Sequence, residues 1–227
     1  MQLKILSWNI WYDGYFDQIS EFLKSSNADI IGLQEVVPND PSRDTIVYLK
    51  KLGYEHVLAP VLELKDGRIM SNAVFSKHGI VRSETYTLSK TESRKAIRAD
   101  IKIGNTELHV FTTHLLHTHQ QLSNIQLSQA ETLLSVLPKS QTIVMGDFNA
   151  THESATIRKM RDGLVDTDPT ETPTWSVYPE GCPICKRPEI DTRLDYIFTT
   201  QDIKTRSFTV GNSKGSDHLP ISIIMDL

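Results

Sequence analysis

Short blocks of apolar residues separated by polar turns fill this chain, a pattern typical of a protein with many strands and few helices. Blocks rich in β-branched and aromatic residues predict strands over 3–9, 30–33, 54–59, 71–76, 80–88, 95–103, 108–113, 142–145, 194–199, 204–210 and 221–225. Apolar residues three and four positions apart predict helices over 15–26, 44–51, 120–137 and 154–162. Gly104-Asn105 predicts a hairpin turn between two of the strands.

The longest predicted helix, over 120–137, ends at Pro138. Its buried face is expected to hold Leu122, Ile125, Ala130, Leu133, Leu134 and Leu137. Strands outnumber helices, and several strands follow one another with no helix between them. This order favours an α+β class, an α/β sandwich of two facing mixed sheets with helices outside, over a doubly wound parallel sheet. No repeat, low-complexity tract or linker divides the chain, so we expect one catalytic domain over residues 1–227.

Composition narrows the class of protein. A hydrophobic fraction of 39% and a charged fraction of 23% exclude a disordered or fibrous chain. No apolar run is long enough for a membrane-spanning helix, and residues 1–7 lack the apolar core of a signal peptide. We therefore expect a cytoplasmic protein without integral membrane association. The net charge of −4 weighs against a module that binds nucleic acid through a basic surface alone, but not against an enzyme that contacts a few phosphates.

Polar residues follow the ends of the predicted strands, where rigid elements hold side chains together and loops give access. These residues are Asn9, Glu35, His114, Asp147, Asn149, Asp195, Asp217 and His218. Carboxylate and amide oxygens without thiolates suit a hard divalent cation, Mg²⁺ or Mn²⁺. Such a cation neutralises a phosphate ester, while the histidines and acids supply proton transfer and charge stabilisation. No Walker loop or G-x-G-x-x-G is present to support a kinase or a dehydrogenase.

Seven short motifs in order carry a family resemblance. They are SWN at 7–9, LQE at 33–35, SNAVFS at 71–76, THL at 113–115, GDFN at 146–149, LDYI at 194–197 and SDHLP at 216–220. With these motifs the chain resembles the endonuclease/exonuclease/phosphatase superfamily, which includes deoxyribonucleases, apurinic/apyrimidinic endonucleases, neutral sphingomyelinases, inositol-polyphosphate phosphatases and tyrosyl-DNA phosphodiesterases. The resemblance spans nearly the whole chain and implies a four-layered sandwich with the site at one end of the paired sheets.

The resemblance also implies roles for individual residues. Glu35 is the principal metal ligand, assisted by Asn9 and Asp217. Asp147 and Asn149 position the attacking water and the phosphoryl oxygens. His218, oriented by Asp195, contacts the scissile phosphate as a base or as a cation. His114 protonates the leaving group or binds a phosphate oxygen. Whether Asp147 or His218 removes the proton from water stays open at this stage.

Three further residues are expected to contact the substrate. Arg94 is a candidate phosphate contact, and Asn72 begins a strand that reaches the site. Trp175, with Tyr178, either lines the substrate site or fixes a long proline-rich loop to the domain.

The same loop contains Cys182-x-x-Cys185, which lacks the second cysteine pair of a zinc knuckle and the βαβ context of a redox motif, so two reduced thiols are expected. The acids Asp166 and Asp168 nearby are expected to be solvated.

The substrate is less well defined by the sequence. Trp11 and His114 stand where apurinic/apyrimidinic endonucleases usually carry Asp and Tyr, which weighs against an abasic-site enzyme. The resulting hypothesis is a Mg²⁺-dependent phosphodiesterase with water as the nucleophile, acting on DNA or RNA slightly ahead of lipid or inositol phosphate. A phosphomonoesterase is the nearest alternative, and an inactive scaffold that keeps the fold is the alternative from another class.

Overall fold

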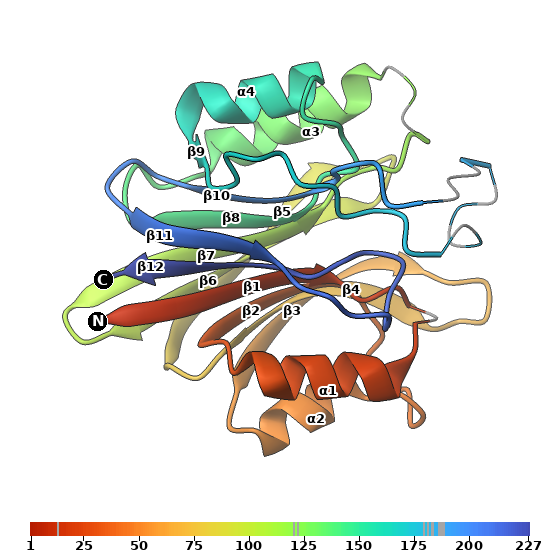
Figure 1. Cartoon of the computed structure of the whole chain (residues 1–227), viewed down its shortest axis with the longest axis horizontal. Coiled ribbons are helices and arrows are strands. Elements are labelled where there is room, and N and C mark those ends of the chain that lie inside the picture. The colour runs from red at the N-terminus through yellow and green to blue at the C-terminus, as the bar shows by residue number, and fades with distance from the viewer. Residues whose placement is uncertain are drawn as a thin grey trace.

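The protein is described here by a computed structural model that covers residues 1–12, 14–119, 121, 123–178, 180, 182, 184–185 and 189–227. Two six-stranded mixed sheets face each other in this part of the chain (Figure 1). The first sheet has the order β11 (Lys204–Val210), β12 (Ile221–Asp226), β1 (Gln2–Asn9), β2 (Ile30–Val36), β4 (Ile69–Ser76) and β3 (Glu55–Glu63). The second has the order β5 (Ile80–Ser89), β6 (Arg94–Ile103), β7 (Thr106–His114), β8 (Thr142–Asp147), β10 (Asp195–Thr199) and β9 (Val165–Asp166).

Two helices cover the outer face of each sheet (Figure 1). The first sheet carries α1 (Phe16–Ser26) and α2 (Thr45–Lys51), and the second carries α3 (Asn124–Ser135) and α4 (Ala155–Gly163). The predicted four-layered sandwich is therefore confirmed. The predicted hairpin at Gly104-Asn105 is present as well, with Gly104 at a φ of 58° between β6 and β7.

Alternation along the strands builds the layers. In β1, Leu3 and Ile5 face the core between the two sheets, whereas Leu6 and Trp8 pack in the layer under α1 and α2. Because side chains point to opposite faces at successive positions, a strand buried on both sides is continuously apolar. The same division places Ile143 between the sheets.

The long helix differs from its prediction. It begins at Asn124 because Ser123 caps it, with the Ser123 hydroxyl accepting the Ile125 N–H at 3.2 Å. Of the predicted stretch, Gln120 and Leu122 lie outside the described residues, and Ile125 is exposed rather than buried. The buried face of the helix carries the predicted Ala130 and Leu133, together with Gln126 and Gln129, which were not predicted. These glutamines bind backbone groups of the loops beneath them, which an apolar-periodicity argument does not capture.

The loop between β9 and β10 corrects two expectations. Asp166 and Asp168 are not solvated, because both lie against the buried guanidinium of Arg193, which contacts Asp166 Oδ1 at 2.6 Å and Asp168 Oδ2 at 3.6 Å. Cys182 and Cys185 are not separate thiols, because a disulfide joins them. Arg193 stands two residues before Asp195, so its ion pairs fix the start of β10.

The order of the first sheet places β12 in its interior, although β12 is formed late in the chain. β12 pairs antiparallel with both β11 and β1. The two ends of the chain meet there, where the Leu227 N–H donates to the Met1 carbonyl at 2.9 Å. The opposite end of the sandwich is formed by the loops that follow β1, β7 and β8 (Figure 1).

Candidate active site

Inward-facing rows of side chains on β1 and β8 end in predicted site residues. In β1 the row of Leu3 and Ile5 continues to Asn9, and in β8 Ile143 leads in the same way to Asp147. Both end residues are buried. The alternation that builds the core therefore turns these polar side chains toward each other at the end of the sandwich.

Strand register brings the second group together. His114 on β7 pairs with Asp147 on β8, and Asp147 pairs with Asp195 on β10. Three neighbouring strands thus carry three ionisable residues at one level. Gly146 permits the close approach of β7 and β8, because a Cβ at this position, whose φ is 147°, would collide with the carbonyl oxygen of Thr113.

Glu35 reaches the site through an irregularity in β2. Leu33 and Val36 both pack on the outer, helix-covered side of the sheet, so the strand changes its alternation between them. Glu35 itself has a φ of 61°, in the left-handed region that a non-glycine residue enters at a cost of about 1–3 kcal/mol. Strand bulges re-aim side chains in this way at functional sites.

A chain of hydrogen bonds orients His218. Its Nδ1 lies 2.8 Å from Asp195 Oδ2, and that oxygen also accepts the Thr174 hydroxyl at 2.6 Å. The other ring nitrogen, Nε2, lies 3.6 Å from Asp147 Oδ2. His218 is thereby held between two carboxylates from the second sheet.

Asn9 links the two sheets across the site. Its Nδ2 donates to Glu35 Oε1 at 3.1 Å and to Asp147 Oδ2 at 3.0 Å, while its Oδ1 accepts the Trp11 N–H at 3.0 Å. The second oxygen of Glu35 accepts the Tyr12 N–H at 3.1 Å. In this orientation the Asn9 amide N–H groups hold the two carboxylates, and metal binding by Asn9 stays a prediction.

The carboxylates share an excess of negative charge in a buried place. Burial, and then repulsion from Asp217, raises the pKa of Glu35. Burial also raises the pKa of Asp217, where neighbouring Asp195 adds to the increase. Burial raises the pKa of Asp147 to about 7. Groups crowded in this way gain most from a cation, and their oxygen donors fit a hard divalent ion.

The two histidines of the site have opposite charge states. Burial lowers the pKa of His218, but attraction to Asp195, Asp147 and Asp217 outweighs this and raises it well above the usual value. Burial, together with repulsion from nearby cations such as Arg94, lowers the pKa of His114 well below the usual value. At neutral pH His218 is therefore an imidazolium and His114 a neutral imidazole.

These side chains surround one pocket of about 530 Å³. Its described lining residues are Asn9, Trp11, Tyr12, Glu35, Leu62, Leu64, Met70, Arg94, His114, His117, Asp147, Trp175, Glu180, Asp217 and His218. Within the described part of the chain, the buried Nε and Nη1 of Arg94 and the buried Nδ1 of His114 have no hydrogen-bond partner. Buried donors without partners in a pocket are what a bound anion would satisfy.

Three predicted residues hold neighbouring parts of the site. The Asn72 amide donates to the Lys95 carbonyl at 2.9 Å, and Asn72 is absent from the described lining. The Asn149 amide donates to the Leu115 carbonyl at 3.1 Å and to Asp147 Oδ2 at 3.3 Å. Trp175 is buried, and its ring N–H donates to Asp217 Oδ2 at 3.3 Å. Direct substrate contact by these residues stays a prediction.

Sequence reasoning missed Thr174 and His117. Thr174 lies in the proline-rich stretch, where nothing in the spacing indicates that its hydroxyl would bind Asp195. His117 lines the pocket. The run of histidines at 114, 117 and 119 was a signal for it, because three imidazoles within six residues after a strand are unusual for a surface turn.

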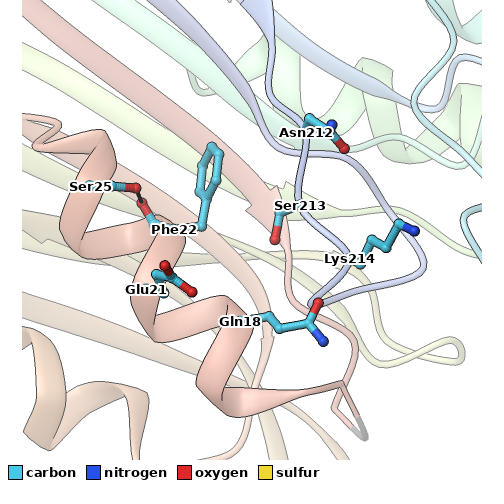
Figure 2. Close-up of a pocket in the computed structure, with 7 residues that line it drawn as sticks. All are labelled: Gln18, Glu21, Phe22, Ser25, Asn212, Ser213 and Lys214. Atoms are coloured by element: carbon cyan, nitrogen blue, oxygen red, sulfur yellow. Dashed lines mark hydrogen bonds between the residues drawn. The ribbon is translucent and has the colours of Figure 1, made fainter.

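A second pocket, of about 290 Å³, lies between α1 and residues 212–214 and serves as a contrast (Figure 2). Figure 2 shows Gln18, Glu21, Phe22 and Ser25 along α1, with Lys214 across from them. It has one acid, one lysine and no histidine among its described lining residues, and it shares no residue with the predicted site. The predicted chemistry belongs to the first pocket.

The whole sequence was also compared with known proteins. A model of the Endonuclease/Exonuclease/phosphatase family matches residues 6–218, which include every predicted site residue. The chain belongs to this family. Endonuclease/exonuclease/phosphatase proteins are phosphoester hydrolases and generally depend on a divalent metal, which the acid and histidine groups of this site can bind. No curated protein sequence matches the chain significantly.

Solved structures of the endonuclease/exonuclease/phosphatase family share the fold. A family member from Bacteroides vulgatus has a TM-score of 0.79 at 18% identity, over 100% of this chain and 99% of that one. A mannosyl-6-phosphatase from Bacteroides thetaiotaomicron has a TM-score of 0.73 at 18% identity, over 99% of this chain and 100% of that one. The catalytic domain of human Nocturnin, with a bound sulfate anion, has a TM-score of 0.71 at 21% identity, over 99% of this chain and 94% of that one.

None of the described helices is both long and apolar enough to cross a membrane.

Proposed function

We propose that this protein is a Mg²⁺-dependent phosphodiesterase that acts by in-line attack of an activated water, with nucleic acid as the first substrate class to test. The observation that carries the proposal is that one pocket holds both crowded carboxylates and buried N–H groups without hydrogen-bond partners among the described residues. The negative charges of Glu35 and Asp217 repel each other and would be stabilised by a cation, while Arg94 has free N–H groups for an anion. A metal ion and a phosphate together satisfy both.

Glu35 and Asp217 would hold the metal, with Asn9 keeping Glu35 in place. When bound, Mg²⁺ would act as a Lewis acid that withdraws charge from the phosphoryl group. Mn²⁺ prefers the same oxygen ligands and is expected to substitute for it.

Asp147 is the better candidate for the general base. A base works best when its pKa lies near the working pH, and burial raises the pKa of Asp147 to about 7. Asp147 would take a proton from water as the water oxygen bonds to phosphorus and the bond to the leaving oxygen breaks. Asn149 would hold this carboxylate in place through its amide.

His218 then acts as a cation. Held by Asp195, its imidazolium would stabilise negative charge that builds up on the phosphoryl oxygens, together with Arg94. A neutral His114 is a weak proton donor but a good hydrogen-bond partner, so phosphate binding is favoured over protonation of the leaving group. The products are a phosphomonoester and an alcohol, and the leaving oxygen takes its proton from solvent.

Nicking of supercoiled plasmid tests the proposal. Wild-type protein should nick with Mg²⁺ and not with chelator, and Glu35→Gln should lower the rate at least about 100-fold. Glu107→Gln makes the same chemical change at a partly exposed residue outside the described pocket lining and should keep the wild-type rate. Nicking that survives both chelator and Glu35→Gln would contradict the assignment of Glu35.

A phosphomonoesterase that acts on a small substrate is the second candidate, because the pocket has few cations in its described lining to contact a polymer. Arg94 is the one arginine or lysine among its described lining residues, and Leu62, Leu64 and Met70 give it an apolar wall. Polymeric DNA usually engages several cationic side chains. Comparing a phosphodiester with a monoester of the same nitrophenol distinguishes the two. An inactive scaffold is the third outcome, and it predicts no Glu35-dependent Mg²⁺ binding.

A further inference from the structure

A second cluster of metal-ligand side chains lies beside the pocket. His117 and His119 follow β7, and Cys182 and Cys185 belong to the loop before β10. The Cys182 sulfur lies 3.4 Å from His119 Nδ1 and 3.9 Å from His117 Nε2, and the Cys185 sulfur lies 3.5 Å from each of these nitrogens. All four ligand atoms lie within 4.8 Å of one another. Two segments distant in sequence thus present two nitrogens and two sulfurs to one point.

The disulfide accounts for the cysteines but not for the histidines. A disulfide sulfur is at best a weak hydrogen-bond acceptor, so it gives two imidazoles little reason to converge on it. The Cys182 sulfur also accepts the Cys185 N–H at 3.2 Å, so a backbone donor and two imidazoles gather around it. The arrangement therefore resembles a ligand set whose sulfurs are oxidised in this structure.

The distances fit a tetrahedral zinc site. With Zn–S near 2.3 Å and Zn–N near 2.0–2.1 Å, tetrahedral geometry separates each nitrogen from each sulfur by about 3.5 Å. The four nitrogen–sulfur distances run from 3.4 to 3.9 Å. The two sulfurs, bonded to each other in the disulfide, must separate to about 3.8 Å when it is reduced.

We propose that the reduced protein binds one Zn²⁺ through His117, His119, Cys182 and Cys185. Two thiolates and two imidazoles select zinc and leave no open position for a substrate, which is the pattern of a structural site. This donor set differs from the oxygen ligands of the active site. A dithiol reductant supplies the two electrons and two protons that convert the disulfide to thiols, and zinc binding releases those protons as thiolates form.

The site would fasten a wall of the catalytic pocket. The His117 ring lies edge-on to Trp175, with centroids 6.0 Å apart, and both side chains line the pocket. Trp175 in turn donates to Asp217. Zinc would therefore fix the loop before β10 against the segment after β7, with a direct effect on the position of a candidate Mg²⁺ ligand.

Cobalt titration of the reduced, metal-free protein tests the site. One equivalent of Co²⁺ should give a thiolate-to-metal charge-transfer band and the strong visible absorption of tetrahedral Co²⁺, and Zn²⁺ should abolish both. The thiolate band separates this site from the carboxylate site, so it should persist in Glu35→Gln. Protein kept in the disulfide form should show no band.

Variants complete the test. Cys182→Ser and Cys185→Ser should lose the band, and His119→Gln, at a partly exposed position, should weaken binding at least about tenfold. His152→Gln, at another solvent-accessible histidine outside the cluster, should bind like wild type. Zn²⁺ should raise the melting temperature of the reduced wild type but not of Cys182→Ser. Circular dichroism before titration confirms that each reduced protein is folded. A folded, reduced protein without the band, or a band that His119→Gln leaves unchanged in affinity, would overturn the proposal.

Discussion

Replacing Asp195 with Asn tests how His218 works. The substitution keeps the shape of the side chain and an acceptor for the Thr174 hydroxyl, but it removes the charge that lies 2.8 Å from His218 Nδ1. Attraction to Asp195 is the largest of the effects that raise the pKa of His218. Asp195→Asn should therefore lower that pKa, while Asp147, 3.6 Å from Nε2, continues to favour the imidazolium.

The size of the effect follows from the charge that this hydrogen bond loses. A hydrogen bond to a charged group contributes about 1.5–3 kcal/mol, and about 1.4 kcal/mol corresponds to a factor of ten. The ratio of imidazolium to imidazole at a given pH should then fall about 10- to 150-fold. The limb of the pH–rate profile that reports His218 should move to lower pH by about one to two pH units.

The pH dependence of kcat/KM shows which limb moves. A base must be deprotonated, so activity rises as pH passes the pKa of Asp147, about 7. A cation must stay protonated, so activity falls above the pKa of His218, which lies well above 6.5. Asp195→Asn should shift the alkaline limb to lower pH by the larger amount. The acidic limb should move less in the same direction, because repulsion from Asp195 is only a secondary cause of the raised pKa of Asp147. The control is Asp100→Asn, because Asp100 is a buried partner of His109, at 2.7 Å from Nδ1, and neither residue is among those lining the pocket.

Two results would refute this reasoning. If the acidic limb moves by about one to two pH units and the alkaline limb stays in place, His218 is the base and Asp147 is not. If neither limb moves and kcat/KM stays within about threefold of wild type, the Asp195–His218 pair has no part in the reaction. A profile for Asp100→Asn that shifts as much as that of Asp195→Asn would show that the effect is not specific to the site.

Three further predictions concern stability and substrate binding. Gly146→Ala should lower the free energy of unfolding by about 3 kcal/mol or more in urea titrations, because its Cβ would collide with the Thr113 carbonyl oxygen; an unchanged midpoint would contradict this. Arg94→Ala should lower kcat/KM about 10- to 150-fold, the value of a charge-assisted hydrogen bond, without lowering the melting temperature, because its buried Nε and Nη1 have no partner to lose; a lower melting temperature with full activity would assign it a structural role. Asp100→Asn should cost about 3 kcal/mol at pH 7 because it removes the buried carboxylate charge that pairs with the Arg98 guanidinium. Burial raises the pKa of Asp100, but hydrogen bonds from His109 and two arginines lower it overall, so this stability is present above about pH 4 and the difference from wild type should vanish as pH falls below that value.

The layered fold could be predicted because alternation and strand order are local properties of the sequence. In the first strand, Leu3 and Ile5 on one face and Leu6 and Trp8 on the other already indicate a strand that is buried on both faces. The long helix was harder to place. Its buried face is partly polar, and Gln126 is there to donate to the Asn149 carbonyl. No rule based on apolar spacing identifies a residue whose partner is a backbone group 23 positions away.

The membership of the site could be predicted, but its internal geometry could not. Motif order indicated Glu35, yet simple alternation would put its side chain with Leu33 on the helix-covered face. Its φ of 61° depends on the surrounding sheet and has no signature in composition. The Cys-x-x-Cys pair was set aside because its expected partner was a second cysteine pair. Its neighbours in space are histidines more than 60 positions earlier, and only tertiary structure brings the two together.

The interior position of β12 has a consequence for biosynthesis. Until residues 221–226 emerge from the ribosome, β1 and β11 lack the strand that joins them, and both expose unpaired edges. Asp217 and His218 are translated just before that strand, so the first sheet and the candidate site are completed by the same segment. Strand pairing between segments this far apart in sequence is slow, and the unpaired edges are prone to aggregation until it forms. Truncation within β12 should therefore yield insoluble protein rather than a weakened enzyme.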